Sequence, residues 1–282
     1  MPEYLLGVRG HDYGSGDVKE IFSRIKQDGW NCTQLALKKL VAGVRSYQDV
    51  TPEVIFEVQD AMKATGMEIS VLGTYVELAS LDAQKRRKDV ADFISQISVC
   101  KALNANCIAS ETTYFEPGCS AVSREDSLDI LINSLEAIMP EAECQGVTVA
   151  LEPVWFHTMN TVEATSIVIN RIKSPNLRII FDPGNLLSPE WINRQDELYS
   201  RAVESWGDLI AAVHFKGLHR IEEGYHPCSL QESVIDYRAV FEALKGVPQK
   251  QLPLLREEGS PKTAKRDQAF IKQFHKSKFK GV

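Results

Sequence analysis

The sequence predicts a single (β/α)8 barrel, and three observations lead to this fold class. Short apolar runs alternate with longer segments of helical periodicity along the whole chain of 282 residues. Eight such units in a chain of this length are typical of the α/β fold called the TIM barrel. No linker rich in proline, glycine or serine divides the sequence, so residues 1–282 are expected to form one domain.

The apolar runs have the length and composition of buried parallel strands. Each is short, and most are followed by polar or turn-forming residues. In chain order the predicted strands are Leu5–Val8, Cys32–Leu35, Ile69–Leu72, Cys107–Ser110, Val147–Leu151, Ile179–Phe181, Ile210–Val213 and Pro253–Leu255.

The segments between the strands carry the start and stop signals of helices. A side chain that can cap a helix, or a proline in the first turn, marks the beginnings, and glycine marks several ends. The predicted helices run from Asp17 to Gly29, from Thr51-Pro52 to Gly66, from Ser80 to Leu103, from Ser123 to Gln145 with Gly146 as the stop, from Thr161 onward, and over Gln195–Trp206, Asp236–Leu244 and Thr263–Phe274.

Two segments lack helix and strand signals. The stretch Gly217–Val234 has no clear periodicity and is long for a loop, so we expect an irregular loop that covers the site. The tail His275–Val282 carries three lysines and is expected to be a frayed end.

Composition and charge narrow the class of function. Charged residues make up 25% of the chain and apolar residues 44%, as in ordinary globular proteins. A net charge of −6 gives no basic surface for nucleic acid, and no run of about 18 uncharged apolar residues could cross a membrane. The first residues lack the pattern of a signal peptide, so we expect a cytoplasmic protein without nucleic-acid or membrane partners.

The six cysteines show no Cys-x-x-Cys spacing. Cys32, Cys100, Cys107 and Cys144 lie in apolar strand or helix contexts, so they are predicted to be small buried residues rather than disulfide partners or zinc ligands.

Ionisable side chains follow several predicted strands at the point where each strand ends. Asp182 comes directly after the strand that ends in Phe181, where Pro183 and Gly184 turn the chain; its alternative role is only to cap that turn. Together with Glu152, His214 and Glu257 it forms a series spaced by 30, 32 and 43 residues, about one strand–helix unit each. In a barrel the carboxyl ends of all strands meet at one face, where active sites lie.

Two glutamates, one aspartate and one histidine at one rim predict a metal site. Hard oxygen ligands with one imidazole suit Mn²⁺ or Mg²⁺ better than structural zinc, and three crowded carboxylates repel one another without a cation. We expect one divalent ion, Mn²⁺ first, with Mg²⁺, Co²⁺ and Zn²⁺ as alternatives. Glu257 rather than Glu258 is the predicted ligand, because it continues the inward alternation of Leu255. The alternative interpretation is four unrelated polar residues, each satisfied by local backbone.

Four motifs carry a resemblance to a known family. They are Leu-Glu-Pro at 151–153, Phe-Asp-Pro-Gly-Asn at 181–185, Val-His-Phe-Lys at 213–216 and Arg-Glu-Glu-Gly at 256–259. As an ordered set they resemble the sugar-phosphate isomerase/epimerase group of the xylose-isomerase-like TIM-barrel superfamily. That superfamily also holds ketose 3-epimerases, inosose dehydratases and endonuclease IV.

The resemblance implies roles for particular residues. Glu152, Asp182, His214 and Glu257 would bind one divalent metal, and Glu152 and Glu257 would also transfer the proton. Arg220 stands where the epimerases keep a substrate-positioning arginine. Two departures are visible, because Asn185 replaces a histidine that is usual near the substrate and Glu258 doubles the final ligand position.

The activity that this set implies is proton transfer at a carbon next to a carbonyl, through an enediolate, in a sugar isomerase or epimerase. A metal stabilises the charge of that intermediate, and a carboxylate on each face can remove and return the proton. The alternatives are an inosose-type dehydratase on the same site, a DNA repair enzyme like endonuclease IV, and a sugar-binding barrel without catalysis. The expected substrate is a small sugar or polyol, phosphorylated or not, and the expected assembly is a homodimer or homotetramer.

Further residues near the strand ends are candidates for substrate contact. These are His11, Tyr75, Glu111, His157, Asn185, Lys216 and Arg220. His11 has a turn role as its alternative, His157 a surface position, and Lys216 either a phosphate or hydroxyl contact or simple solvation. Trp155 and Trp191 flank the two central motifs and are expected either to wall the pocket or to pack in the core.

Overall fold

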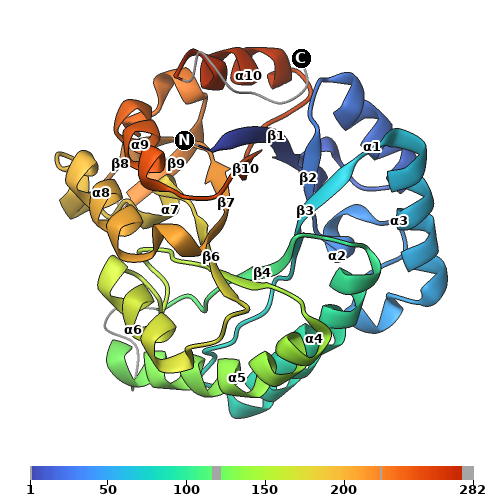
Figure 1. The fold of residues 1–282 in the computed structure, drawn as a ribbon, viewed down its shortest axis with the longest axis horizontal. Coiled ribbons are helices and arrows are strands. Elements are labelled where there is room, and N and C mark those ends of the chain that lie inside the picture. The colour runs from blue at the N-terminus through green and yellow to red at the C-terminus, as the bar shows by residue number, and fades with distance from the viewer. Residues whose placement is uncertain (1, 116–121, 223, 275–282) are drawn as a thin grey trace.

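The predicted barrel is present in the structure, a computed structural model that describes residues 2–115, 122–222 and 224–274. Within these ranges the eight predicted strands pair in parallel and close on themselves in the order β1-β10-β7-β6-β5-β4-β3-β2. Figure 1 looks down the barrel, with the strands around the centre and the helices outside them. The chain is therefore a single TIM barrel.

The strand bounds differ from the predicted ones mainly at their ends. The strands are β1 (Glu3–Arg9), β2 (Cys32–Leu35), β3 (Glu68–Gly73), β4 (Cys107–Glu111), β5 (Val149–Glu152), β6 (Leu177–Phe181), β7 (Ile210–Phe215) and β10 (Gln251–Arg256). Polar residues such as Glu3, paired with Gln251, extend strands beyond their apolar runs, because backbone pairing does not depend on the side chain. β5 starts at Val149, two residues later than predicted.

The helices agree closely with their predicted positions. They are α1 (Val18–Gln27), α3 (Pro52–Thr65), α4 (Ala83–Ala102), α5 (Arg124–Gln145), α6 (Val162–Ile172), α8 (Gln195–Trp206), α9 (Tyr237–Ala243) and α10 (Ala264–Gln273). The Asp17 carboxylate accepts a hydrogen bond from the Glu20 amide at 2.8 Å, as expected of a cap. Gly66 ends α3 in the left-handed conformation, with φ 66°. Thr51 precedes α3, but its side chain makes no capping hydrogen bond.

Short elements at the loops complete the fold. Two one-turn helices, α2 (Leu37–Leu40) and α7 (Pro183–Leu186), follow β2 and β6. Turns of 3-10 helix occur at η1 (Gly10–Tyr13), η2 (Tyr47–Asp49), η3 (Pro189–Trp191), η4 (Gly207–Leu209), η5 (Leu230–Glu232) and η6 (Leu244–Gly246).

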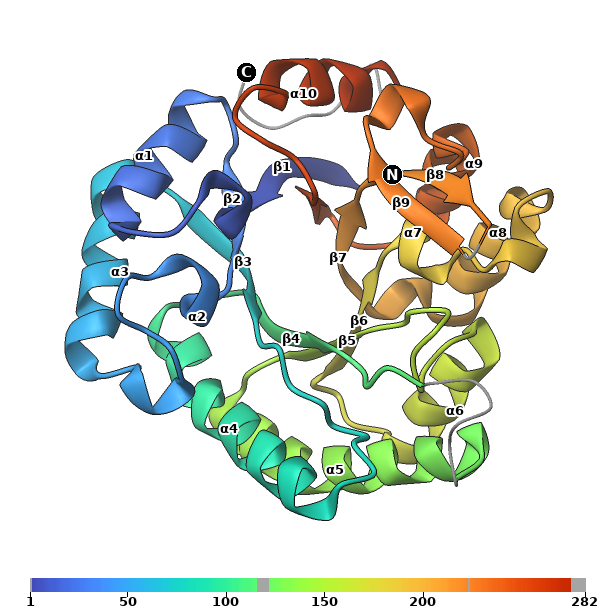
Figure 2. The ribbon, with the colours of Figure 1, turned by 180° about the vertical axis from the view of Figure 1, so that it is seen from behind.

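The prediction of an irregular loop over Gly217–Val234 was wrong. Most of this segment is an antiparallel hairpin of β8 (Gly217–Ile221) and β9 (Gly224–Cys228), which lies beside β7 in Figure 2. A side chain at Gly217 would collide with the carbonyl oxygens of Cys228 and Ser229, so only glycine allows this approach. The sequence pattern did not predict this hairpin, because its strands are short and mostly polar and have no alternating apolar face.

The prediction that four cysteines are buried is confirmed for three of them. Cys144 is exposed, because it lies on a solvent-facing position of α5, whereas Cys32, Cys100 and Cys107 are buried as predicted. The tail His275–Val282 lies outside the described residues.

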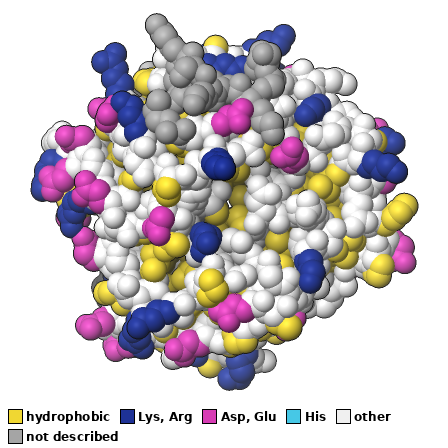
Figure 3. Space-filling model, viewed as in Figure 1, with side chains coloured by type: hydrophobic (Ala, Val, Ile, Leu, Met, Phe, Trp, Pro, Cys, Tyr) yellow, Lys and Arg dark blue, Asp and Glu magenta, His cyan; other side chains and the backbone are white. Residues whose placement is uncertain are grey.

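On the face in Figure 3, acidic and basic side chains are interspersed around the rim. Among the described helices, none is long and apolar enough to cross a membrane.

Candidate functional site

The site is built on the layer of side chains at the carboxyl end of the barrel. Alternate residues of the strands face inward, and one apolar layer contains Ala150, Ile180, Ala212 and Leu255. Two positions further along these four chain segments come the four predicted ligands, Glu152, Asp182, His214 and Glu257. Strand alternation therefore turns all four into the same layer, directly above an apolar floor.

Glu152 and Glu257 both approach the same nitrogen of the His214 ring. The Nδ1 atom of His214 is 3.0 Å from Oε2 of Glu152 and 3.4 Å from Oε1 of Glu257. All three side chains are buried, at 6% exposure or less. Of the two adjacent glutamates, Glu257 points into this group, while the side chain of Glu258 is 40% exposed and pairs with Arg9.

Asp182 is held by the start of α7. Its Oδ1 atom accepts hydrogen bonds from the amides of Gly184 at 2.7 Å and Asn185 at 2.9 Å, so the predicted capping role is real. Oδ2 remains free of this cap and faces the cluster. A Cβ at Gly184 would lie 2.9 Å from Leu218 and 3.2 Å from Oδ1, so the turn has no room for a larger residue.

Lys216 brings a positive charge into the same space. Its ammonium nitrogen is 2.9 Å from Oδ2 of Asp182 and 3.0 Å from Oε2 of Glu257. It also donates to Oδ1 of Asn185 at 3.1 Å, and the Asn185 amide donates to Oε1 of Glu152 at 2.6 Å. We call Glu152, Asp182, His214, Lys216 and Glu257 the rim cluster.

Excess negative charge shapes the protonation of the rim cluster. Burial alone lowers the pKa of His214, but the carboxylates of Glu257 and Glu152 outweigh it and raise that pKa to about 9. Burial raises the pKa of Asp182 to about 6, against the opposing effect of Lys216. Burial also acts to raise the pKa of Glu257, yet the positive charges of Lys216 and His214 hold it well below its usual range.

Part of the rim cluster has the geometry of a metal site. One ligand atom each from Glu152, Asp182 and His214 lie within 4.8 Å of one another. The Nε2 atom of His214 is buried and has no hydrogen-bond partner among the described residues. Two carboxylates with one imidazole form a donor set that suits a divalent cation, so the residues fit the predicted metal. Glu257 is outside this group of three.

Four other predicted contact residues lie around the mouth of the barrel. Glu111 ends β4, and burial and the Glu152 charge raise its pKa to about 7 although 43% of its side chain is exposed. His157 is buried, with Nε2 3.8 Å from Oε2 of Glu111, and burial lowers its pKa to about 4. The rings of His11 and Tyr75 meet edge to face at 6.0 Å, and burial lowers the pKa of His11 to about 4.

Arg220 lies on β8 of the hairpin and not at the end of a barrel strand. It is exposed on β8 and pairs in register with Tyr225 of β9. It is not among the described residues that line the two cavities next to the rim cluster. Its role toward a substrate stays a prediction.

Arg9 and Gln34 belong to the site although sequence analysis did not select them. Arg9 ends β1, where its guanidinium binds Oδ1 of Asp12 at 2.7 Å and approaches Oε2 of Glu257 at 3.7 Å. Gln34 lies two positions after Cys32 of the apolar layer. Both residues stand on the inward alternation that begins at Leu5 and Cys32, and this alternation is the signal that could have identified them.

Two cavities border the rim cluster. The smaller, of about 40 Å³, is lined by Arg9, Gln34, Gly73, Thr74, Tyr75, Ala109, Ser110, Glu111, Glu152, His214 and Glu257. The larger, of about 360 Å³, lies beyond Asn185 and Lys216 and is mostly aromatic or apolar, with Tyr114, Trp155, Phe156, Leu218, Tyr225 and Pro227 in its wall. Trp155 is therefore a pocket wall, one of the two roles expected of it.

Comparison with known proteins gives a family and a set of similar structures. The family described as "Xylose isomerase-like TIM barrel" matches residues 22–274. A search of curated protein sequences finds no significant match.

Solved structures with a similar fold have low sequence identity to this chain. A 3-keto-D-glucoside 4-epimerase from E. coli, YcjR, has a TM-score of 0.75 and 18% identity over 96% of this chain and 100% of that one. The IolI protein with a bound zinc atom has a TM-score of 0.75 and 15% identity over 98% and 100%. A D-psicose 3-epimerase with D-tagatose from Clostridium cellulolyticum H10 has a TM-score of 0.73 and 13% identity over 95% and 98%. At these identities the likeness establishes the shared fold.

Proposed function

The chain belongs to the xylose isomerase-like TIM-barrel family, and from this premise we propose that it is a divalent-metal-dependent sugar isomerase or epimerase. The proposed reaction moves a proton at a carbon next to a carbonyl group. Its proposed substrate is a ketose or a related polyol-derived ketone. The proposed metal is Mn²⁺, with Mg²⁺, Co²⁺ and Zn²⁺ as alternatives.

The observation that carries the proposal is the surplus of buried carboxylates around His214. Glu152, Asp182 and Glu257 share one space with a histidine whose Nε2 has no partner among the described residues. Buried carboxylates repel one another and are costly to ionise, so such a group is stable only when further positive charge compensates it. A divalent cation supplies that charge, and it would be held by Glu152, Asp182 and His214, with Glu257 completing the set.

Each residue has a distinct part in the proposed chemistry. When bound, the metal stabilises the negative charge that develops on the carbonyl oxygen as the neighbouring carbon loses its proton. Lys216 and His214 keep Glu257 ionised at neutral pH, so it has a carboxylate oxygen that can accept that proton, although the same two positive charges weaken it as a base. Glu152, the second carboxylate beside His214, would return a proton to the opposite face of the substrate. Lys216 and Asn185, joined at 3.1 Å, orient the substrate hydroxyls.

The names of the similar structures agree with this reaction class. One is a 3-keto-D-glucoside 4-epimerase and another a D-psicose 3-epimerase. Both names describe inversion of a sugar centre. The proposal transfers the reaction class to this chain, not the substrate of either protein.

Deuterium exchange tests the proposal directly. The purified protein with Mn²⁺ and a panel of ketoses, inososes and sugar phosphates in D₂O should place deuterium on the carbon beside the carbonyl. Glu257→Gln should slow this exchange by about 10²–10⁴-fold, because an amide fills the space but cannot take the proton. Glu57→Gln is the matched control: this glutamate of α3 is exposed and lines neither cavity, and the exchange rate of the variant should stay close to that of the unmodified protein.

Other outcomes would identify the alternatives. Exchange accompanied by loss of water from the product would indicate the dehydratase. The absence of exchange with the whole panel, together with retained metal binding, would contradict catalysis and leave a sugar-binding barrel.

A further inference from the structure

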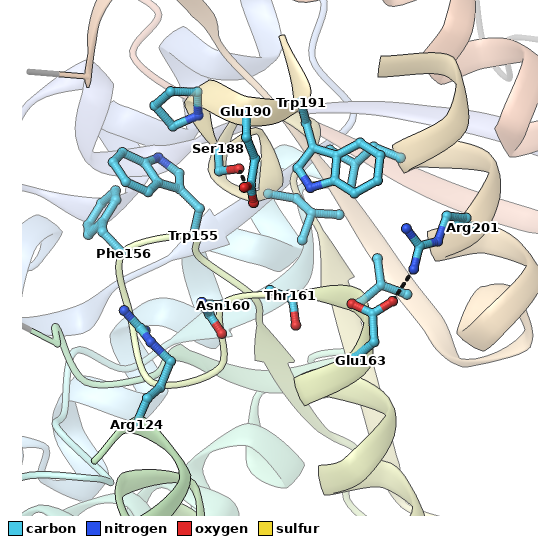
Figure 4. A pocket seen from close by; sticks show the side chains of 14 residues that line it. Arg124, Trp155, Phe156, Asn160, Thr161, Glu163, Ser188, Glu190, Trp191 and Arg201 are labelled. Atoms are coloured by element: carbon cyan, nitrogen blue, oxygen red, sulfur yellow. Dashed lines mark hydrogen bonds and ion pairs between the residues drawn. The ribbon is translucent and has the colours of Figure 1, made fainter. Parts of the chain in front are cut away.

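A third cavity, also of about 360 Å³, lies outside the barrel rim, between the loop after β5 and the loop before α8. Figure 4 shows Trp155 and Phe156 on one side of it and Trp191 on the opposite side, with Glu190 between them. Asn160 and Thr161 line the side nearest the start of α6. We call this space the outer cavity.

The outer cavity adjoins the larger cavity next to the rim cluster. Trp155 and Phe156 line both spaces, and their rings meet edge to face at 5.2 Å. The Trp155 amide donates to the carbonyl of Asn185 at 2.8 Å, which fixes this wall to the turn that also holds Asp182. A molecule anchored at the rim cluster could therefore extend past Trp155 into the outer cavity.

The two tryptophans of the outer cavity differ from the others of the chain. Trp30 and Trp206 are 1% and 0% exposed and belong to the core. Trp155 and Trp191 are only partly buried and line the outer cavity. The guanidinium groups of Arg194 and Arg201 lie 4.7 and 5.3 Å from the centre of the Trp191 ring, so a ligand would cover the part of this ring that they leave exposed. Exposed indole surface gains free energy when a ligand covers it, and such rings are frequent anchors in binding sites.

The charges of the outer cavity balance. Its lining contains two cations, Arg124 and Arg201, and two anions, Glu163 and Glu190. Arg201 pairs with Glu163, and the Ser188 hydroxyl lies 3.3 Å from a Glu190 oxygen. A neutral lining disfavours a phosphate group. Aromatic faces together with amide, hydroxyl and carboxylate groups instead match a sugar ring, which has apolar C–H faces and hydroxyls that need partners.

We propose that the outer cavity binds a neutral glycosyl unit attached to the substrate, so that the substrate is a keto sugar of disaccharide size. The keto sugar would lie at the rim cluster, and the attached unit would lie between Trp155 and Trp191. This inference rests on the proposed function, whose substrate class it narrows from any small ketose to a glycosylated one.

Tryptophan fluorescence can measure this preference without catalysis, because Trp30 and Trp206 are buried and ligand-dependent changes come from Trp155 and Trp191. D-fructose, isomaltulose (glucosyl unit on O6 of fructose) and fructose 6-phosphate would be titrated into the Mn²⁺-loaded protein. Isomaltulose, or another glucosyl- or galactosyl-fructose (turanose, maltulose or lactulose), should bind about tenfold or more tighter than D-fructose, the effect of about one covered aromatic ring. Fructose 6-phosphate should show no such gain.

Variants locate the gain in the outer cavity. Trp191→Ala should weaken the disaccharide about tenfold and leave D-fructose binding and its deuterium exchange unchanged. Glu190→Gln, at an exposed position, is a second test that does not remove core packing, and it should weaken the disaccharide several-fold. Phe56→Ala is the matched control, because this aromatic residue of α3 is 69% exposed and lies outside both cavities.

The outcomes separate this inference from the proposed function. Equal affinity for D-fructose and all four disaccharides, a preference for fructose 6-phosphate, or equal losses for both ligand sizes in Trp191→Ala would overturn the glycosyl site. The size preference without deuterium exchange would support the site and count against catalysis. Exchange without the size preference would leave catalysis intact and remove the site.

Discussion

Two buried ionic groups of this protein contain adjacent residues, Arg256 and Glu257, and differ in whether their charges balance. Arg256 and Glu257 follow one another at the end of β10 and point to opposite sides of the barrel wall. Arg256 faces outward and forms an ion pair with Asp267 of α10, with 3.0 Å between Nε and Oδ2. Glu257 faces inward and joins the rim cluster.

The charges of the outward group are compensated within the protein. The side chains of Arg256 and Asp267 are 2% and 0% exposed, and the exposed Arg266 adds a second cation, with its Nε atom 3.7 Å from Oδ1 of Asp267. The other guanidinium nitrogens donate to the carbonyls of Phe215 at 3.4 Å and Glu258 at 3.3 Å. This group needs no further ligand and serves to join α10 to the barrel.

The inward group is unmatched. Three carboxylates face one ammonium and one histidine, and the histidine keeps a buried nitrogen without a partner among the described residues. The difference teaches that burial of charge does not by itself indicate function. What distinguishes the two groups is whether the charges balance without a ligand.

The largest expected effect comes from breaking the outward pair. Arg256→Met leaves the buried Asp267 carboxylate with only the exposed Arg266, 3.7 Å away, which should lower the free energy of unfolding by about 3–5 kcal/mol. Urea denaturation followed by circular dichroism measures this loss. Metal binding by the folded protein should not change. Arg256→Met combined with Asp267→Leu should recover most of the stability, and a loss below about 1 kcal/mol in the single variant would show that the pair is not structural.

A substitution in the inward group should weaken metal binding without lowering the stability of the metal-free protein. Asp182→Asn keeps the oxygen that caps α7 but removes a charge, so metal affinity should fall at least about 100-fold, a larger loss than removal of an outer partner gives. In chelator, the same variant should be no less stable than the unmodified protein, because one repulsive charge is gone. Isothermal titration with Mn²⁺ and thermal melts measure the two quantities.

Asp236→Asn is the matched control for this variant. Asp236 caps α9 in the same way, with its carboxylate accepting from the amides of Arg238 and Ala239, but it is not part of the rim cluster. Its metal affinity should match that of the unmodified protein. Unaltered affinity in Asp182→Asn itself would contradict the proposed metal site.

The stability contributed by the inward group should also depend on pH, through the protonation of His214. Without metal, the pKa of His214 is raised to about 9 from an unfolded value of about 6.5. The stability that the protonated ring contributes is complete below about pH 6.5 and is lost as the pH rises through 9. A bound metal replaces that proton, so metal affinity should increase by up to about tenfold per pH unit up to 9.

Thermal melts at pH 6.5 and 9, in chelator and in excess Mn²⁺, measure this linkage. The melting temperature should fall with pH in chelator and depend less on pH with metal. His214→Gln should abolish the fall. A metal-free protein whose stability is independent of pH in this range would show that His214 is not protonated there.

The smallest expected effect concerns Lys216. Its ammonium lies between two carboxylates of the inward group and repels an incoming cation. Lys216→Met should therefore bind Mn²⁺ more tightly, by about tenfold, which corresponds to roughly 1.4 kcal/mol. Lys216→Arg, which retains the charge, should bind as the unmodified protein does. Weaker binding in Lys216→Met would mean that the lysine supports the metal site instead of competing with it.

Most of the fold could be predicted from the sequence because two periodicities decide it. The apolar runs located every barrel strand, and caps such as Asp17 and Ser123 located the helix starts, since these signals are local. The hairpin of β8 and β9 could not be predicted in this way. Its pairing is stabilised by contacts such as Gly217 against Cys228, which no local apolar pattern records.

The site was predictable to the extent that strand alternation determines it. Glu152 and His214 stand two residues after inward-facing apolar residues, and the structure brings them together. The ammonium of Lys216 between the carboxylates could not be foreseen, because a side-chain rotamer decides it. Arg220 was selected by resemblance alone, and its exposed position on β8 follows from the hairpin that sequence analysis did not find.

The hairpin also bears on how a protein of this kind can diversify. β8 and β9 form a sheet of their own and share no ladder with the barrel. The turn residue Gly224 nevertheless reaches Trp155, where a Cβ would lie 3.7 Å from the indole. Insertions or deletions in this hairpin would leave the strand register beneath it intact while reshaping the wall around Trp155. Substrate range could then drift during evolution, or be changed by loop grafting, while the inherited reaction chemistry stays the same.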